Sequence, residues 1–204
     1  MSTEVDLDLA NLAAKVGRSM VRVEHGGRGL GTGTIWHPRG LIVTNAHVAH
    51  VGPLSALLDD GRLLKTSLIG IDRKLDVAAL QLEIEIEEEV EAIPIGDARK
   101  LRPGELIFAM GFPWGQGSGL TLGSFIGFSP SSEAGSGADG AWLSGSLHLR
   151  PGHSGGPMFN TSGELVGLNT VMQGPDVGIA IPVYRAAEAV KRFLPTGENA
   201  PVHA

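Results

Sequence analysis

The sequence predicts an all-β fold built from many short strands, with one helix near each end of the chain. Glycine accounts for 30 of the 204 residues, about twice the usual share of roughly 7%, which is typical of chains with many tight turns. Short apolar runs recur along the sequence, and turn-forming residues separate them. Hydrophobic residues make up 42% of the chain, which is enough for a buried core at this length.

The first half of the chain is expected to hold one helix and six strands. Residues 5–16 are predicted to be helical because apolar side chains recur at positions 5, 9, 12, 13 and 16, close to the 3.6-residue period. Strands are expected at residues 21–23, 30–36, 41–43, 54–58, 63–71 and 78–82. The acidic run 83–89 is interpreted as a solvated connection, with a functional acidic patch as the alternative.

The second half is expected to hold six more strands and the closing helix. The strands are predicted at residues 106–111, 120–126, 142–147, 158–159, 165–171 and 178–181. Residues 129–140 are rich in Ser, Gly and Ala, a composition that favours a flexible loop. Alanines and a valine in the stretch 184–193 indicate a helix that ends the fold.

Charge and composition exclude several classes of partner. The formal net charge is −6 and the 16 Lys and Arg residues are spread along the chain, so we expect no nucleic-acid partner. No stretch approaches the ~18 apolar residues of a spanning helix, so we expect no membrane partner. Residues 1–8 lack the pattern of a secretory signal, and the sequence contains no cysteine. These observations predict a cytoplasmic location, with export as the alternative if a leader has been removed.

A single serine lies in the glycine-rich run Arg-Pro-Gly-His-Ser-Gly-Gly-Pro at residues 150–157. Glycine at position 152 permits a tight turn that would point the N–H groups of Gly152 and Ser154 at one spot. Two such donors beside a hydroxyl are what acyl transfer requires, since they stabilise the charge on the attacked carbonyl oxygen. The alternative is a glycine-rich hairpin with an idle serine.

Two further segments supply partners for this serine. Residues 41–50 end an apolar run with a turn that carries His47, whose imidazole can take and return a proton near neutral pH. Residues 72–80 place Asp76 at the start of another apolar run, where its carboxylate can fix the tautomer of an imidazole. The order His47, Asp76, Ser154 is the order of chymotrypsin-type proteases.

On these motifs the sequence resembles the protease domain of the HtrA (high-temperature-requirement A) family of trypsin-like serine proteases. The resemblance covers about residues 12–193 and includes further motifs at residues 31–33, 40–48, 75–80, 94–97, 101–105, 111–113, 121–123, 152–157 and 178–182. It implies a chymotrypsin/trypsin-like double six-stranded β-barrel forming a single peptidase domain over residues 1–204. The first barrel would occupy about residues 17–95 and the second about 104–183, followed by a closing helix at 184–194 and a tail at 195–204.

The resemblance also implies a function. Ser154 would be the nucleophile of a serine endopeptidase, His47 its general base and acid, and Asp76 the residue that orients His47. The oxyanion hole would be the turn of Gly152, His153 and Ser154. Substrates would be peptides or unfolded proteins, in quality control or regulatory proteolysis, and no cofactor or metal is expected.

Family members often carry a PDZ module, for which we expect no room after the closing helix, and they commonly form trimers through amino-terminal segments. The apolar stripe of residues 5–16 fits such a trimer contact or packing on its own barrel.

The specificity pocket follows only by analogy with this fold. Its walls would be two stretches, formed by His148, Leu149 and Arg150 and by Thr170, Val171 and Met172. Position 148 carries no carboxylate, so we expect no preference for Lys or Arg at the cleavage position. Small or medium aliphatic residues are expected there, and an acidic preference is the alternative if the His148 side chain points inward and is protonated.

His153 departs from the family pattern, which usually has Asn at this position. We hypothesise that it holds the oxyanion turn through a hydrogen bond that changes on protonation, making activity depend on pH beyond the effect of His47. The alternative is a surface imidazole without a role.

Two other functions stay open at this point. His47 and His50 have a spacing that can bind zinc, although no third ligand occurs in a matching motif. A shell of this fold can also serve as a catalytically silent peptide-binding or chaperone-like module. The complete set of His47, Asp76 and Ser154 argues for catalysis, since a pure binder has no physical need for all three.

Overall fold

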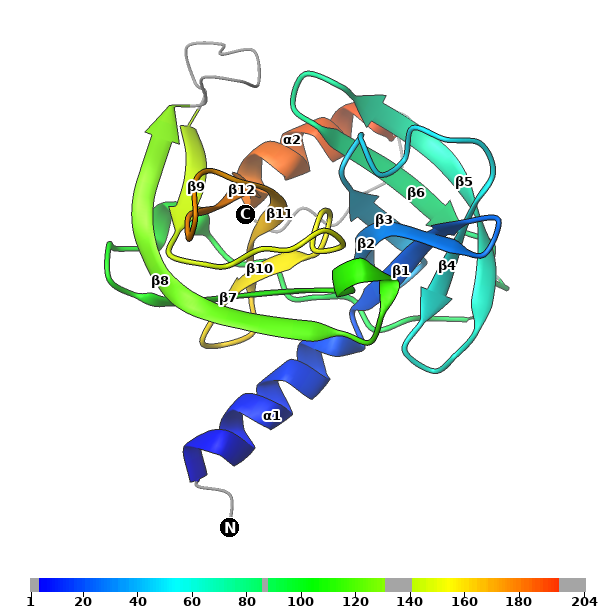
Figure 1. The fold of residues 1–204 in the computed structure, drawn as a ribbon. Coiled ribbons are helices and arrows are strands. Elements are labelled where there is room, and N and C mark those ends of the chain that lie inside the picture. The colour runs from blue at the N-terminus through cyan, green and yellow to red at the C-terminus, as the bar shows by residue number, and fades with distance from the viewer. Residues whose placement is uncertain (1–3, 86–87, 131–140, 195–204) are drawn as a thin grey trace.

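Twelve strands in the described part of the chain form two closed, six-stranded antiparallel barrels that lie side by side (Figure 1). The computed structural model describes residues 4–85, 88–130 and 141–194. This architecture confirms the predicted all-β double barrel. The expected tail 195–204 and residues 131–140 of the expected loop lie outside the described residues.

The first barrel has the strand order β1-β2-β3-β6-β5-β4. Its strands are β1 Met20–His25, β2 Arg28–His37, β3 Leu41–Thr44, β4 Leu54–Leu58, β5 Leu63–Asp72 and β6 Val77–Leu82. β3 and β6 are fully or almost fully buried. Their pairing brings the carboxyl end of β3 beside the start of β6, with Thr44 opposite Ala78. The turns that carry His47 and Asp76 therefore lie next to each other.

The second barrel has the order β10-β11-β12-β9-β8-β7. Its strands are β7 Leu106–Gly111, β8 Gly119–Pro130, β9 Ala141–Gly145, β10 Pro157–Asn160, β11 Leu165–Met172 and β12 Gly178–Pro182. The strands of the two barrels fall within the two spans expected from the sequence. The assignment of residues 1–204 to one peptidase domain stays a prediction.

Two helices accompany the barrels, as the sequence predicted. α1 (Glu4–Gly17) projects from the body in Figure 1, with Val5 exposed at its far end and Val16 buried at its near end. α2 (Val183–Phe193) contacts β5 and β6 of the first barrel as well as β11 and β12 of the second. Its Arg192 donates to Asp72 at the end of β5 over 2.6 Å. α2 thus ties the two barrels together.

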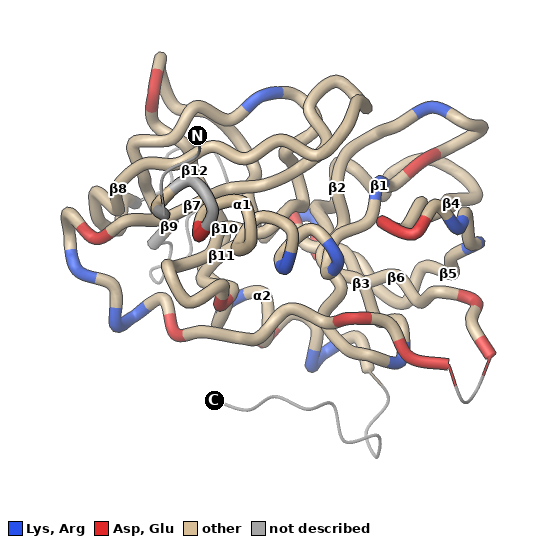
Figure 2. Tube along the Cα trace, turned by 90° about the horizontal axis from the view of Figure 1, so that it is seen from below, with Lys and Arg blue, Asp and Glu red and all other residues tan. Residues whose placement is uncertain are grey.

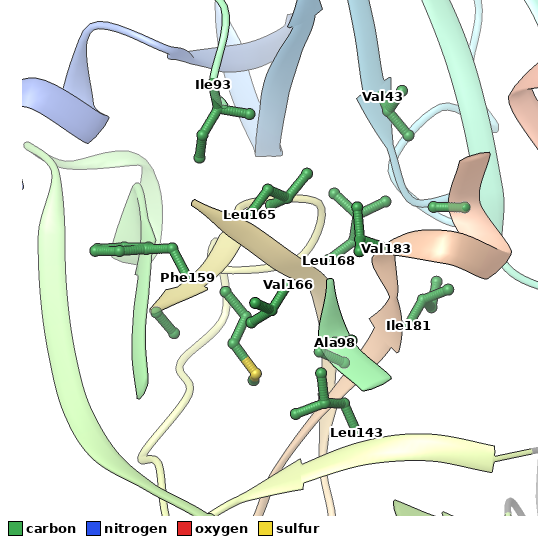
Figure 3. Close-up of a cluster of buried hydrophobic side chains, with 14 of the residues drawn as sticks. Val43, Ile93, Ala98, Leu143, Phe159, Leu165, Val166, Leu168, Ile181 and Val183 are labelled. Carbon is green, nitrogen blue, oxygen red and sulfur yellow. The ribbon is translucent and has the colours of Figure 1, made fainter. Parts of the chain in front are cut away.

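The main hydrophobic core extends across the junction of the barrels. Figure 3 shows Leu165 and Leu168 of β11 close to Val43 of the first barrel and to Ile93 of the connecting segment. Deeper in the second barrel, Phe108 and Phe159 stack with ring centroids 5.4 Å apart. Because the packing is continuous, the barrels are fixed relative to each other and the turns between them are held in register.

The acidic connection between the barrels is solvated, as the sequence indicated. Figure 2 shows its acidic residues on both sides of the thin grey trace that marks residues 86–87, which lie outside the described residues. Glu83, Glu85 and Glu89 are exposed, and Glu91 pairs with Arg18.

Candidate active site

Three turns from different parts of the chain meet at the junction of the barrels. His47 lies in the turn after β3, Asp76 in the turn before β6, and Ser154 in the loop between β9 and β10. Asp76 has a left-handed backbone, with φ at 60°, which aspartate tolerates better than most residues. Its carbonyl accepts hydrogen bonds from the Ala46 N–H over 3.1 Å and from the Asn45 side chain over 3.0 Å. The two turns of the first barrel are therefore locked together.

The Asp76 carboxylate holds His47 by two hydrogen bonds. The His47 ring Nδ1 lies 2.8 Å from Asp76 Oδ2, and the His47 backbone N–H donates to Oδ1 over 3.0 Å. Because a carboxylate only accepts, this contact places the ring proton on Nδ1 and leaves Nε2 free to accept. The hydroxyl of Thr170 donates to the same Oδ2 over 2.9 Å. The His47 side chain is about half exposed.

Ser154 joins this network through Thr170. Its hydroxyl donates to the Thr170 carbonyl over 3.1 Å, so one residue of β11 touches both Ser154 and Asp76. The structure thus gathers the three residues predicted to react, with the serine hydroxyl directed at Thr170 rather than at His47.

The turn before Ser154 has the backbone shape of an anion-binding site. Gly152 has φ at +104°, and a Cβ there would lie 2.1 Å from the Phe112 carbonyl oxygen, so only glycine fits. The Pro151 carbonyl accepts from the Trp114 N–H over 2.8 Å. Since C=O and N–H point oppositely in a trans peptide, the Gly152 N–H points away from Trp114. Within the described residues, the N–H groups of Gly152 and Ser154 have no acceptor, so both are available to an oxyanion.

Strand β2 of the first barrel holds this turn by hydrogen bonds, which the sequence did not predict. The Thr32 hydroxyl donates to the Gly152 carbonyl over 2.6 Å, and the Thr32 N–H donates to the Ser154 carbonyl over 2.9 Å. The Thr34 hydroxyl donates to the Gly155 carbonyl over 3.0 Å. Both threonines are fully buried. Thr32 belongs to the motif at residues 31–33 noted in the sequence, whereas nothing in the sequence marks Thr34 as a support for this turn.

His153 is buried, with 1% of its surface exposed, so the alternative of a surface imidazole is wrong. Its Nδ1 lies 3.1 Å from the Arg150 carbonyl and 3.2 Å from the Arg150 N–H, while its buried Nε2 has no partner in the described structure. Burial lowers the pKa of His153 below its ordinary value, which outweighs the hydrogen bond to the Arg150 backbone. A neutral ring therefore fastens the loop from 150 to 153, and the pH hypothesis stays a prediction.

The two expected pocket walls face each other across a methionine. The Leu149 N–H donates to the Met172 sulfur over 3.1 Å, so the thioether of one wall contacts the backbone of the other. Thr170 and Leu149 are buried, whereas Val171 is 51% exposed. His148 pairs with the exposed carboxylate of Asp176 over 2.9 Å, and about half of the His148 side chain is exposed.

The part of the chain that the structure describes contains no set of side chains that could bind a metal ion. No group of three His, Cys, Asp or Glu side chains is gathered there. His47 uses Nδ1 for Asp76, and His50 directs Nδ1 to the His47 carbonyl. No described helix has the length and apolarity that crossing a bilayer requires.

Comparison with protein families agrees with this geometry. Residues 31–168 match the trypsin-like peptidase domain. The chain belongs to this family. Among solved structures, an HtrA-type protease AlgW with a decapeptide superposes with a TM-score of 0.79 at 23% identity, covering 90% of this chain and 66% of that one. This likeness confirms the fold expected from the HtrA resemblance.

Curated relatives share more of the sequence. A periplasmic serine protease, do/HhoA-like, from Haemophilus influenzae is 34% identical over 84% of this chain. A periplasmic DegP-like serine endoprotease from Rickettsia conorii is 35% identical over 83%, and the chloroplastic Protease Do-like 1 from Arabidopsis thaliana is 31% identical over 93%. The chain spans only 38%, 34% and 45% of these relatives, respectively.

The predicted cytoplasmic location is wrong. The relatives from Haemophilus influenzae and Rickettsia conorii are named periplasmic, as is one from Bartonella henselae. The prediction depended on the composition of residues 1–8 and on the lack of cysteine. Neither property records a compartment, because a chain without cysteine is chemically compatible with oxidising and reducing surroundings alike.

Proposed function

We propose that this chain is a serine endopeptidase that cleaves peptide bonds through an acyl-enzyme on Ser154. The observation that carries the proposal is the hydrogen-bonded series from His47 through Asp76 and Thr170 to Ser154, which draws on both barrels. Family membership and the names of the relatives support the same reaction class. The alternative of a silent binding module gains no support from any relative described above.

In the proposed reaction Ser154 Oγ attacks the carbonyl carbon of the scissile amide while His47 Nε2 takes the hydroxyl proton. Negative charge then develops on the carbonyl oxygen, where the N–H groups of Gly152 and Ser154 stabilise it. His47 returns the proton to the leaving nitrogen, which releases the amine product. Water repeats the sequence on the acyl-enzyme. Asp76 keeps the His47 ring in the tautomer that this proton transfer requires.

The first step requires a rotation of the serine side chain. The Ser154 hydroxyl donates to the Thr170 carbonyl in the free protein. Turning about the Cα–Cβ bond moves a serine hydroxyl between staggered rotamers at little cost. Catalytic hydrogen bonds are often formed only once substrate is bound. We therefore expect bound peptide to favour the rotamer that faces His47.

The pocket walls support a preference for small or medium aliphatic residues at the cleavage position. The Met172 thioether contacts Leu149 of the other wall, and a methionine adapts its shape to an apolar side chain. No carboxylate of the wall residues faces that space to attract Lys or Arg. Asp176 holds His148, which disfavours an inward orientation of the ring and hence an acidic preference.

Labelling by a fluorophosphonate probe tests the proposed activity. Parent protein is expected to react and to hydrolyse a peptide with an aliphatic residue at the cleavage position. Ser154→Ala is expected to do neither while it unfolds at an unchanged temperature. A parent protein that takes up no label, or an equally labelled Ser154→Ala variant, would contradict the proposal.

We propose, as a finer point, that peptide or unfolded segments are the substrates and that copies of the chain associate as trimers. Leu9, Leu12 and Ala13 pack against the core, whereas Val5 is 65% exposed on the projecting part of α1. The helix therefore packs on its own barrel at one end and offers an apolar side chain at the other. Light scattering on the full chain measures the assembly directly.

A further inference from the structure

A pocket of about 370 Å³ lies beside the oxyanion turn, between the first two strands of the first barrel and the segment η2 (Pro113–Gly115). Its lining includes the backbone of Gly29 and Gly31, the Trp114 side of η2, and Gly152. Gly29 at the start of β2 lies against η2, since a Cβ on Gly29 would be 3.3 Å from the Gly115 Cα. This pocket is called the arginine pocket below, because Arg22 and Arg28 also line it.

The charge of the arginine pocket is opposite to that of the whole protein. The chain carries 22 acidic and 16 basic side chains, yet none of the described residues that line this pocket has a carboxylate. Arg28 is exposed and has neither an ion pair nor a hydrogen bond of its side chain with any described residue. Arg150 is not part of the lining, but its guanidinium lies 6.0 Å from the centre of the ring of Trp114, which is.

Arg22 lines the pocket but is already bonded to Glu24 and to η2. Its Nε donates to the buried carboxylate of Glu24 over 2.6 Å, and its Nη1 donates to the Gly115 carbonyl over 2.7 Å. It thereby fixes η2, whose Trp114 N–H holds the Pro151 carbonyl. Glu24 neutralises Arg22, so among the residues that line this pocket Arg28 supplies the unbalanced positive charge.

The position of the pocket determines which part of a peptide reaches it. The walls assigned to the cleavage position, residues 148–150 and 170–172, do not line the arginine pocket. A peptide that lies across Ser154 has its acyl part on the side of those walls. The part that leaves with the amine therefore extends past Gly152 in the opposite direction, towards Gly31 and Arg28.

We propose that the arginine pocket binds a carboxylate of the substrate on the leaving-group side of the cleaved bond. The inference rests on the proposed function and adds a selectivity to it: this peptidase prefers sequences with Asp or Glu shortly after the cut. A guanidinium without an internal partner is suited to this task, because it loses no existing ion pair when it binds a carboxylate. The carboxylate belongs either to a side chain or to the end of a short peptide.

The test begins by counting active sites with the fluorophosphonate probe, which makes no leaving-side contact. Values of kcat/KM are then measured on peptides that differ only in Glu, Gln or Lys at each of the first positions after the cut. At one position kcat/KM for the Glu peptide is expected to exceed that for the Gln peptide by about two- to fivefold at low salt, as for an exposed charge pair. High salt is expected to reduce this ratio towards one.

Matched peptides separate the two sources of the carboxylate. One pair has Glu or Gln inside a long peptide with an amidated end, and the other has a free or amidated terminus shortly after the cut. A ratio above one in the first pair assigns the pocket to a side chain, whereas a ratio above one only in the second assigns it to a terminal carboxylate.

Variants identify the arginine responsible. Arg28→Gln is expected to lower the Glu-to-Gln ratio to near one, and Arg28→Glu is expected to favour the Lys peptide instead. Arg39→Gln is the matched control, because Arg39 is exposed in the turn beyond the other end of β2. Labelled enzyme that shows no preference for a carboxylate in either pair of peptides, or an Arg39→Gln variant that loses the preference as Arg28→Gln does, would overturn the inference. Absence of labelling would instead refute the proposed function.

Discussion

Replacing Gly152 with alanine tests whether the shape of the oxyanion turn is required for catalysis. The residue has φ at +104°, and its missing Cβ would lie 2.1 Å from the Phe112 carbonyl oxygen and 3.1 Å from Pro113 Cα. Both contacts involve backbone, which cannot move aside as a flexible side chain can. The turn itself must therefore rotate, and the Gly152 N–H is expected to leave its position beside Ser154.

The expected loss can be worked out from these contacts. Losing one oxyanion donor lowers kcat by about 10²–10³, or about 2.7–4 kcal/mol of transition-state stabilisation. The left-handed backbone adds a cost of about 1 kcal/mol in stability for a residue with a side chain. We therefore expect Gly152→Ala to fold with a modestly lower free energy of unfolding and to hydrolyse peptide at least about a hundredfold more slowly.

Gly104→Ala is the control for this experiment. Gly104 also has a positive φ, at +93°, but a Cβ there would meet nothing within 4 Å. It lies in a turn before β7, outside the site. Both variants are measured for kcat/KM on one aliphatic peptide and for urea unfolding. If Gly152→Ala retains kcat/KM within about threefold of the parent protein, the assignment of the Gly152 N–H to the oxyanion is wrong.

Two further predictions concern the residues around Ser154. Thr170→Val removes the hydroxyl that donates to Asp76 and is expected to lower kcat by about ten- to a hundredfold, the effect of one hydrogen bond to a charged group. His153→Asn removes a buried ring whose pKa burial lowers, so the native state binds a proton less readily than the unfolded chain. The free energy of unfolding of the parent protein is thus expected to fall by up to about 1.4 kcal/mol per pH unit as pH drops below about 6.5. The free energy of unfolding of the variant is expected to fall less.

Controls accompany both variants. Thr170→Ser retains the hydroxyl and is expected to keep most of the activity that Thr170→Val loses; equal activity in the two variants would remove the role of the hydroxyl. For His153→Asn, urea unfolding is measured near neutral pH and about two units lower. If the free energy of unfolding changes between the two pH values by the same amount in the variant as in the parent protein, His153 does not titrate on unfolding. An unchanged pH profile of peptide hydrolysis would end the hypothesis that its protonation affects the turn.

The elements of the fold could be predicted from local patterns. Strand β4 has the expected bounds of Leu54–Leu58, and β7 has the expected bounds of Leu106–Gly111. Alternation and turn residues are local properties, so the sequence carries them directly. The candidate residues His47, Asp76 and Ser154 were also recognisable, because each stands in a distinctive motif.

Other features required the tertiary structure. Thr32 and Thr34 lie some 120 residues before the turn they hold, and nothing in their own segment indicates that partner. His153 was compatible with surface or interior until packing placed it in the interior. The arginine pocket likewise depends on η2 meeting the first barrel, a contact between segments far apart in the chain.

The sequence by itself determined the strands, the closing helix and the identity of the three residues proposed to react, because short-range periodicity and turn chemistry are written in neighbouring residues. Only the tertiary structure decided how Thr170 links Ser154 to Asp76, which threonines support the oxyanion turn, and that Arg28 lines a pocket beside that turn. The physical reason is that these contacts join residues distant in the chain, and their geometry exists only after the two barrels have packed against each other.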